Sequence, residues 1–548
     1  MKPLEAPVAR RAAVGPAFAF AAAGALAVTL AIYLLRMDRV VGLVVDDAWY
    51  VLLAKALATG DGYTLINSPT PGITPFYPPG FPALLSIFYR LSPVFPDNVW
   101  LLKSVSIAAM IAAGIVAFRY FERDRALPVE VAFALAFATA IYPGLVFLAT
   151  STVMSECVFT LVQLVAILVI ERSVRDASRG AASSAQRYAA VGGVFASIAF
   201  LTRSAGLALL VGGVIYLAKE KLFRQAAIFA VVAAILVGPW TLYSRAHVPT
   251  AEQRVEQGGS IVMPYDVQFW NRVAGRQLSG TIELKDLPGR VFENLTEIGK
   301  ADFGAFVFYS FYRPVEAGET IRLSNRHAAI SLLFAFVALF GYLAAAREKL
   351  TLAEIAVPLA LSICVLWGWE QIRLLAPLVP FLLFYLVIGV RAMARLARVD
   401  ARAQAILLAI VSWVFVVGAL DGNYRYIQKK YDPVPANRPR WISAFEENEA
   451  FIRQLGARVP QGETIATDNP ALVHLYTGHK TIASNNPAAR WRMWKHLGVR
   501  YYAKISPYPV ELDAVESSLP VLHRSDGDLA LRLLDLGPPE SRAAWGEN

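Results

Sequence analysis

Charged side chains border or interrupt the apolar runs of this chain at a few points: the adjacent carboxylates Asp46 and Asp47, then Glu156, Arg203 and Arg373. Ionisable residues at membrane segments are costly, and they are usually functional or paired. Arginine matches phosphate oxygens with two donors at once, and a carboxylate can act as a base. Acids and arginines at one membrane-level site therefore suit an anionic lipid headgroup and a base.

Each of these residues also has a simpler interpretation. One member of the Asp46–Asp47 pair could be a solvated loop residue or a helix N-cap. Glu370 precedes Arg373 by about one helical turn, so these two could pair locally or reach water at the membrane surface. These interpretations explain single residues better than the set, because all of its members project to the same face of the predicted membrane.

The composition indicates a membrane protein. Hydrophobic residues make up 56% of the 548 residues and charged residues only 17%, whereas soluble domains carry roughly 45–50% and 25%. The two cysteines, Cys157 and Cys364, lie inside apolar runs and predict neither a disulfide framework nor a zinc site. The six histidines show no metal-ligand spacing of the HExxH kind.

Apolar runs approaching the ~20 residues that a bilayer core requires predict eleven transmembrane helices. They fall near residues 14–35, 99–118, 127–148, 152–171, 188–202, 204–218, 224–242, 327–346, 352–367, 374–390 and 404–420. The first run is too long for the apolar part of a signal peptide. We therefore expect it to remain as a membrane helix.

The distribution of charge orients these helices. If odd-numbered spans leave the cytoplasm, every predicted cytoplasmic segment is basic, for example the one with Arg119, Arg123 and Arg125. The short opposite connections near 149–155 and 367–373 hold one arginine between them. Much of the net charge of +10 is thus an orientation signal, and no nucleic acid partner is needed. We expect a multi-pass protein of the cytoplasmic membrane with a cytoplasmic N-terminus.

This orientation puts a first loop (37–98), a large loop (243–326) and the tail on the outer face. We expect a transmembrane catalytic domain over 1–420 and an extracytoplasmic α/β domain over 421–548. In the first loop, "AWYVLLAKALATG" and Pro82–Leu91 predict two amphipathic helices that form a platform beside the membrane.

The tail alternates predicted helices and strands. "WISAFEENEAFIRQLG", the stretch from Asn469 and "NPAARWRMWKHLG" predict helices, while "ETIATD", "KTIAS" and "RYYAKI" predict strands. A region of roughly 100 residues is enough for one small domain.

Several short motifs resemble the GT-C glycosyltransferases, most closely the branch of protein O-mannosyltransferases and bacterial lipid A aminoarabinose transferases. They are "DDAWYVLLAKAL", "YPPGFPALL", "SECVF", "LTRSAG", "GPWTLYSRA", "RLLAPLVPFLL" and, in the tail, "IATDNPALVHLYTGHKT". Together they span most of the chain in the family's order. The fold that the resemblance implies is an α-helical polytopic membrane protein of GT-C type.

The activity that the resemblance implies is inverting transfer of a monosaccharide. The donor would be a polyprenyl-phosphate sugar, and the acceptor a hydroxyl of a glycolipid, polysaccharide or protein on the outer face of the bacterial cytoplasmic membrane. In the family, the first member of the acidic pair is normally the catalytic base, which is Asp46 here. Asp47 stands where many relatives have Glu.

The donor site implied by the resemblance departs from the family at one position. Some relatives carry a basic residue before the Pro-Pro pair that touches the donor phosphate, and this chain has Tyr77. This leaves Arg203 and Arg373 as candidate phosphate ligands, with Tyr77 in the same site, and it puts aminoarabinose in doubt as the sugar. The remaining expected supporting residues are Glu156, Tyr50 and Glu370.

No metal ion or other cofactor is expected. Adjacent carboxylates rarely both face one site, and the sequence shows no other cluster of metal ligands. Because water would compete by hydrolysing the donor, the loop 243–326, with its aromatic "FGAFVFYSFYRP", and the tail are candidates for a roof over the site.

Other functions compete with glycosyl transfer. A lipid-linked sugar transporter or flippase would often show inverted repeats and broken helices near the midplane, but no internal repeat is visible and the charged groups project to one face. A polymerase or ligase of lipid-linked glycans would lack the acidic platform and the α/β tail. A receptor with a decayed site is a third alternative, and the intact Asp46 argues against it.

Overall fold

Helices occupy every predicted span. The computed structural model describes residues 15–42, 46–273, 280–308, 325–368, 371–484 and 493–537. Eight helical stretches within those residues are long and apolar enough to cross a membrane: Pro16–Arg36, Val99–Asp124, Val129–Thr150, Glu156–Ser178, Phe223–Ala246, Asn325–Glu348, Ile372–Leu396 and Ala401–Lys430. The expected class, a polytopic α-helical membrane protein with a C-terminal α/β region, is confirmed.

The helices of the bundle are α1 (Pro16–Arg36), α4 (Val99–Arg119), α5 (Val129–Ala140), α6 (Pro143–Thr150), α7 (Glu156–Ser178), α8 (Ala182–Thr202), α9 (Leu207–Lys219), α10 (Phe223–Ala246), α15 (Asn325–Glu348), α16 (Leu352–Leu366), α17 (Gln371–Leu375), α18 (Val379–Leu396) and α19 (Ala401–Lys430).

Three of the eleven predicted spans fall outside the set of eight long apolar stretches. Helices α9 and α16 have only 13 and 15 residues, and α8 begins with the polar turn "ASSAQR". Helix α19 continues to Lys430, so the tail leaves the bundle beyond residue 420.

The predicted span 127–148 is divided into two helices. Helix α5 ends at Ala140, and Pro143 occupies the first turn of α6. Proline has no N–H, and its ring clashes with the preceding turn of a helix, so it starts a helix more readily than it continues one. The division directs the chain from α6 toward residues 151–155, which precede Glu156.

The predicted platform of the first loop is present as α2 (Asp47–Thr59) and α3 (Gly80–Leu91). The two helices pack against each other and bury an apolar face that includes Leu52, Phe81 and Leu85. Helix α2 ends at Thr59 and is followed by Gly60, whose φ of 90° is left-handed, a conformation that glycine adopts without a Cβ penalty.

The large loop contributes short helices: α11 (Ala251–Gln257), α12 (Tyr265–Trp270), α13 (Leu287–Glu297) and α14 (Phe303–Val307). Helix α11 begins with a capping box. The side chain of Thr250 accepts from the backbone N–H of Gln253, and the side chain of Gln253 accepts from the backbone N–H of Thr250. The second half of the aromatic stretch predicted as a roof, from residue 309, lies outside the described residues.

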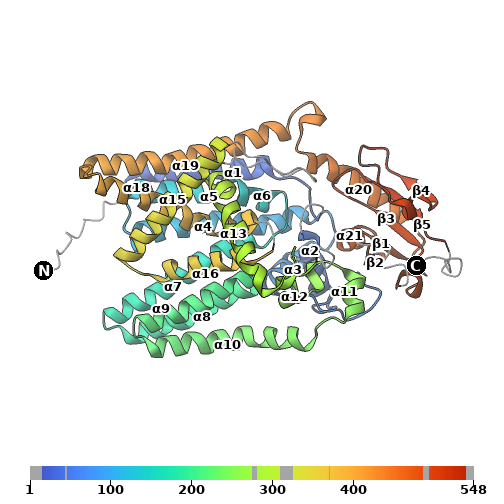
Figure 1. Cartoon of the computed structure of the whole chain (residues 1–548), viewed down its shortest axis with the longest axis horizontal. Coiled ribbons are helices and arrows are strands. Elements are labelled where there is room, and N and C mark those ends of the chain that lie inside the picture. Colours follow the sequence, from blue (N-terminus) through green and yellow to red (C-terminus); the bar gives the residue numbers. More distant parts are fainter. Residues whose placement is uncertain are drawn as a thin grey trace.

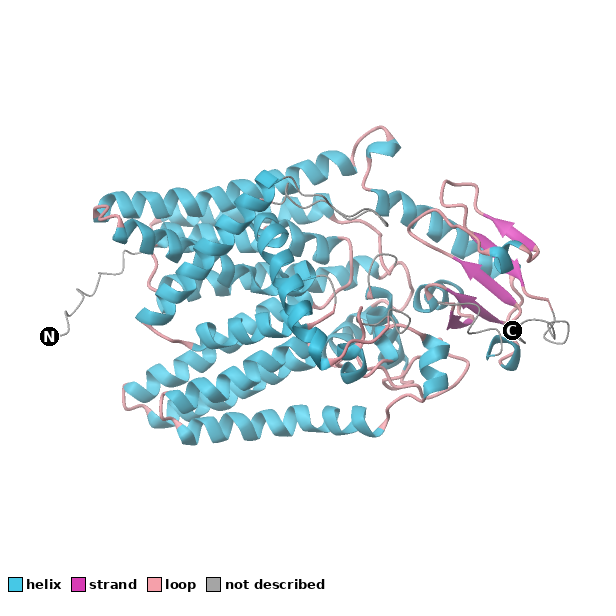
Figure 2. Ribbon diagram, in the orientation of Figure 1, coloured by secondary structure: helices cyan, strands magenta, loops and turns pink. Residues whose placement is uncertain are grey.

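The tail is an α/β unit at the opposite end of the molecule from the bundle (Figures 1 and 2). It contains α20 (Arg440–Arg458), β1 (Thr464–Thr467), α21 (Pro470–Thr477), β2 (Lys480–Ala483), β3 (Tyr501–Lys504), α23 (Ala514–Ser517), β4 (Val521–Arg524) and β5 (Arg532–Asp535). The strand order is β2-β1-β3-β5-β4, in which β2, β1 and β3 are parallel and β5 is antiparallel to both of its neighbours. Of the predicted helix "NPAARWRMWKHLG", residues 486–492 lie outside the described residues, and residues 493–496 are helical.

Hydrogen bonds attach the tail to the first loop. The backbone N–H of Thr481 donates to the carbonyl of Asn67 at 2.7 Å, and Lys480 donates to the carbonyl of Ile66 at 2.8 Å. The side chain of Asn469 donates to the carbonyl of Gly42, which precedes the acidic pair. The tail therefore contacts the segment that carries the candidate base.

Candidate active site

The two adjacent carboxylates occupy different environments. Asp46 lies at the N-cap position of α2 without capping the helix, and its side chain is 36% exposed. Asp47 is buried, and its Oδ2 accepts from the backbone N–H of Val153 at 3.2 Å. Burial raises the pKa of Asp47 to about 7, against the opposing effect of backbone hydrogen bonds and Lys103. Because successive residues of a helix point about 100° apart, one carboxylate is open to ligands and the other is part of the interior.

Arg373 lies between two carboxylates. Its Nη2 is 3.6 Å from Asp46 Oδ2, and its Nε is 3.5 Å from Glu156 Oε1. Charge-assisted contacts of this kind are normally about 2.7–2.9 Å. The guanidinium on α17 is therefore near both acids and tightly bound to neither.

Glu156 is shared with a second arginine. Arg203 Nη1 is 2.7 Å from Glu156 Oε1 and donates to Ser155 Oγ at 3.1 Å. Arg203 ends α8 in an extended conformation, with φ of −150°, which directs the chain away from the helix axis. Four groups of alternating charge, Asp46, Arg373, Glu156 and Arg203, thus form one row that the sequence predicted as a set.

The row is incompletely satisfied. Glu156 is fully buried, and a buried carboxylate is destabilising unless it is paired and hydrogen-bonded. Within the described ranges, neither Glu156 oxygen accepts a hydrogen bond of good geometry, and Arg373 Nε donates none. Buried donors and acceptors left in this state are unusual in folded proteins, so the row has capacity for further polar contacts.

Two tyrosines lie beside the row. The rings of Tyr50 and Tyr77 are 5.2 Å apart, and Tyr50 OH is 3.4 Å from Ser155 Oγ. The hydroxyl of Tyr77 is 2.9 Å from Ser260 Oγ. Burial raises the pKa of Tyr50 to about 12 and also raises that of Tyr77. Both phenols therefore remain protonated donors at neutral pH.

Glu370, predicted to support the site, lies outside the described residues. The expected local pairing of Glu370 with Arg373 stays a prediction. Among the described residues, no three His, Cys, Asp or Glu side chains come together in an arrangement that could hold a metal ion.

Lys103 is a positioning residue that the sequence interpretation missed. It is fully buried, and its Nζ donates to the carbonyls of Asp38, Val40 and Thr150 at 2.8, 2.7 and 2.8 Å and pairs with Asp38 Oδ1 at 3.2 Å. These contacts join the segment that leads to Asp46 with the segment that leads to Glu156. The signal was present as one lysine inside the apolar stretch "VWLLKSVSIAAM".

Comparisons with known proteins identify similar solved structures but no sequence relatives. No protein-family model matches the chain, and no curated protein matches it either. The crystal structure of ArnT from Cupriavidus metallidurans in the apo state is similar at 14% identity, covering 95% of this chain and 98% of that one with a TM-score of 0.49. The crystal structure of the same protein bound to undecaprenyl phosphate is similar at 14% identity, covering 96% and 99% with a TM-score of 0.46. Each similarity extends over nearly the whole of both chains.

Proposed function

We propose that this chain is an inverting glycosyltransferase of GT-C type. It would transfer a monosaccharide from a polyprenyl-phosphate donor to a hydroxyl of a glycolipid, polysaccharide or protein on the outer face of the cytoplasmic membrane. The observation that carries the proposal is the row in which the accessible carboxylate of Asp46 adjoins Arg373, Glu156 and Arg203.

Asp46 is the proposed general base. A sugar or protein hydroxyl is a poor nucleophile, and a positioned carboxylate that takes its proton during attack contributes about 10²–10⁴-fold. The hydroxyl oxygen bonds to the anomeric carbon as the bond from that carbon to the phosphate oxygen breaks. The electron pair stays on the polyprenyl phosphate, and one displacement of this kind inverts the anomeric centre.

Arg373 is the proposed ligand of the leaving phosphate, assisted by Arg203. Negative charge develops on the phosphate as the bond breaks, and one preorganised donor at such a point contributes roughly 3–4 kcal/mol. Arg373 can turn toward an incoming phosphate because its contacts with Asp46 and Glu156 are long. Glu156 holds Arg203 at 2.7 Å and lies 3.5 Å from Arg373, and Tyr50 and Tyr77 would supply further donors.

Asp47 has a proposed positioning role. Its carboxylate binds the backbone of Val153, which is close in the chain to Ser155 and Glu156. This contact fixes the start of α2, and therefore Asp46, relative to the arginines.

The test supplies purified protein with a panel of polyprenyl-phosphate monosaccharides and measures donor consumption and sugar transfer. We expect one donor to be used, and Asp46→Asn to lose more than about 10²-fold of the activity while still binding that donor. Asp61→Asn, which changes an exposed carboxylate of the same loop, is the matched control and should behave as wild type. Full activity in Asp46→Asn would assign the base elsewhere. Binding without consumption of any donor would favour a transporter.

A further inference from the structure

The tail sheet has a topological switch point between β1 and β3. From β1 the chain passes through α21 to β2 on one side, and β3 then pairs with the other side of β1. Ligands of open α/β sheets bind outside the carboxyl ends of the strands at such a point, because the two connections diverge there. Here Asp468 follows the carboxyl end of β1, and Ile505 follows that of β3.

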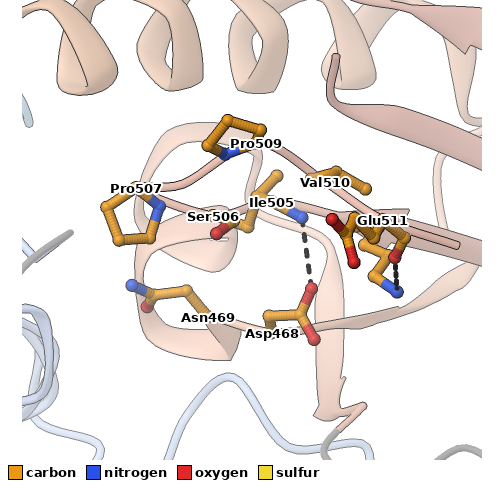
Figure 3. A pocket seen from close by; sticks show the side chains of 9 residues that line it. Asp468, Asn469, Ile505, Ser506, Pro507, Pro509, Val510 and Glu511 are labelled. Atoms are coloured by element: carbon orange, nitrogen blue, oxygen red, sulfur yellow. Dashed lines mark hydrogen bonds between the residues drawn. The ribbon is translucent and has the colours of Figure 1, made fainter. Parts of the chain in front are cut away.

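A pocket of about 320 Å³ lies at this switch point (Figure 3). This volume is at the lower end of the range of small-molecule sites, roughly 300–1,000 Å³. Pro507, Pro509 and Val510 supply an apolar wall, while Asp468 and Ser506 supply oxygen atoms. The pocket therefore offers a ligand both an apolar surface and hydrogen-bond acceptors.

The polar groups of the pocket have more accepting than donating capacity left. Asp468 accepts from the hydroxyl of Ser484 and, at 3.2 Å, from the backbone N–H of Ile505, and a carboxylate has about four acceptor positions. The ammonium group of Lys504 already donates to the carbonyl of Glu511, at 2.8 Å, and to the carboxylate of Glu516. A ligand that supplies donors is thus favoured, and an anionic group would meet the carboxylates of Asp468 and Glu511.

We propose that this pocket binds a saccharide ring. The hydroxyl groups of the ring donate to Asp468 and Glu511, and its C–H face packs on the wall formed by Pro507, Pro509 and Val510. A simple cation would leave that apolar wall uncovered. The pocket adjoins the first loop, since Asn469 on its rim donates to the carbonyl of Gly42. That the saccharide belongs to the acceptor rests on the proposed function, whereas the binding itself does not.

The test titrates the full-length chain, in detergent, with methyl glycosides of glucose, mannose, galactose and N-acetylglucosamine, using saturation-transfer NMR and calorimetry. We expect at least one glycoside to bind and Asp468→Asn to weaken it about tenfold or more, because a hydrogen bond to a charged group is lost. Asp528→Asn, an exposed carboxylate outside the pocket, is the matched control and should leave the affinity unchanged. Glu511→Gln provides a second pocket variant if Asp468→Asn fails to fold, and it should also weaken glycoside binding.

Three results would overturn the proposal: no glycoside binds, binding is equal in wild type and both pocket variants, or spermidine binds at Asp468 while glycosides do not. The membrane-level site is tested separately. Asp46→Asn should bind glycosides like wild type, and Asp468→Asn should bind undecaprenyl phosphate like wild type. A chain that binds glycosides but uses no polyprenyl-phosphate donor would overturn the proposed enzyme and leave the pocket assignment intact.

Discussion

Arg373 and Arg125 each face a buried glutamate near opposite ends of α7, but their contacts differ. Arg125 holds Glu354 with two guanidinium nitrogens, at 2.6 and 3.1 Å, and also donates to Thr351 at 2.9 Å. Glu354 in turn accepts from Tyr385 at 3.3 Å. Among the described residues, Arg373 forms no ion pair this short, since its distances to Asp46 and Glu156 are 3.6 and 3.5 Å.

Exposure separates the two clusters in the same direction. The side chain of Arg125 is 8% exposed, against 22% for Arg373 and 36% for Asp46, whereas the two glutamates, Glu354 and Glu156, are both 0% exposed. The bidentate contacts between Arg125 and Glu354, here the closed pair, join α16 to the residue that follows the helical stretch Val99–Asp124. In the open row, only the contacts of Arg373 are long, while Arg203 pairs with Glu156 at 2.7 Å; the long contacts of Arg373 support its proposed role as a phosphate ligand.

The largest expected effect is on folding, at the closed pair. Glu354→Ala leaves the buried guanidinium of Arg125 without its partner, which should lower the free energy of unfolding by about 3–5 kcal/mol. Thermal or denaturant unfolding in detergent measures it. Glu348→Ala removes the 62% exposed partner of Arg391 and should lower the free energy of unfolding by no more than about 1 kcal/mol. Equal losses in the two variants would remove the distinction between a closed pair and a surface pair.

The next effect is on activity, at the open row. Arg373→Ala should lower sugar transfer about 10²–10³-fold through lost stabilisation of the leaving phosphate, with a change in unfolding free energy below about 1 kcal/mol because its contacts are long. Initial rates and unfolding of the same preparation measure both quantities. Arg245→Ala, at an exposed arginine of α10, is the control. A large loss of stability in Arg373→Ala would show that the row is structural like the Arg125 pair.

A smaller effect concerns pH. The folded-state pKa of Asp47, about 7, is above the ordinary value of 3.8, so the folded chain binds more protons than the unfolded chain between these values. Its contribution to stability is present at low pH and is lost as pH rises through about 7, by roughly 1 kcal/mol per pH unit. Asp47→Asn, which cannot ionise, should remove this slope, and unfolding measured from pH 5 to pH 8 tests it. A slope that persists in Asp47→Asn would assign it to other groups.

The smallest effect is expected when both members of the closed pair are replaced. Arg125→Met with Glu354→Leu should remain within about 1 kcal/mol of wild-type stability, because a buried pair can be exchanged for apolar groups of similar size. In the open row, Arg203→Met with Glu156→Leu should also fold, but its sugar transfer should stay low. Unfolding and transfer assays on the two double variants measure this. Wild-type sugar transfer in the double variant of Arg203 and Glu156 would exclude these two residues from the site.

Features encoded by short-range patterns were predicted well. The apolar runs placed helices at all eleven positions, and amphipathic spacing predicted α2 and α3, although α3 begins at Gly80 rather than Pro82. In the tail, β1, β2 and β3 were predicted from their apolar residues. Strands β4 and β5 were missed, although all five strands have four residues. Strand β4 is mostly exposed, and the two buried leucines of β5 lie between charged residues, so neither shows a clear pattern.

The sequence by itself predicted that the charged residues of the row stand at one level, because span length and chain direction place the ends of helices. Only the tertiary structure decided how they meet: that Asp46 is open while Asp47 is buried, and that Glu156 lies between Arg203 and Arg373. Lys103 likewise gains its role from three carbonyls in two distant segments. Periodicity reports the local backbone, whereas these contacts depend on how separate helices pack.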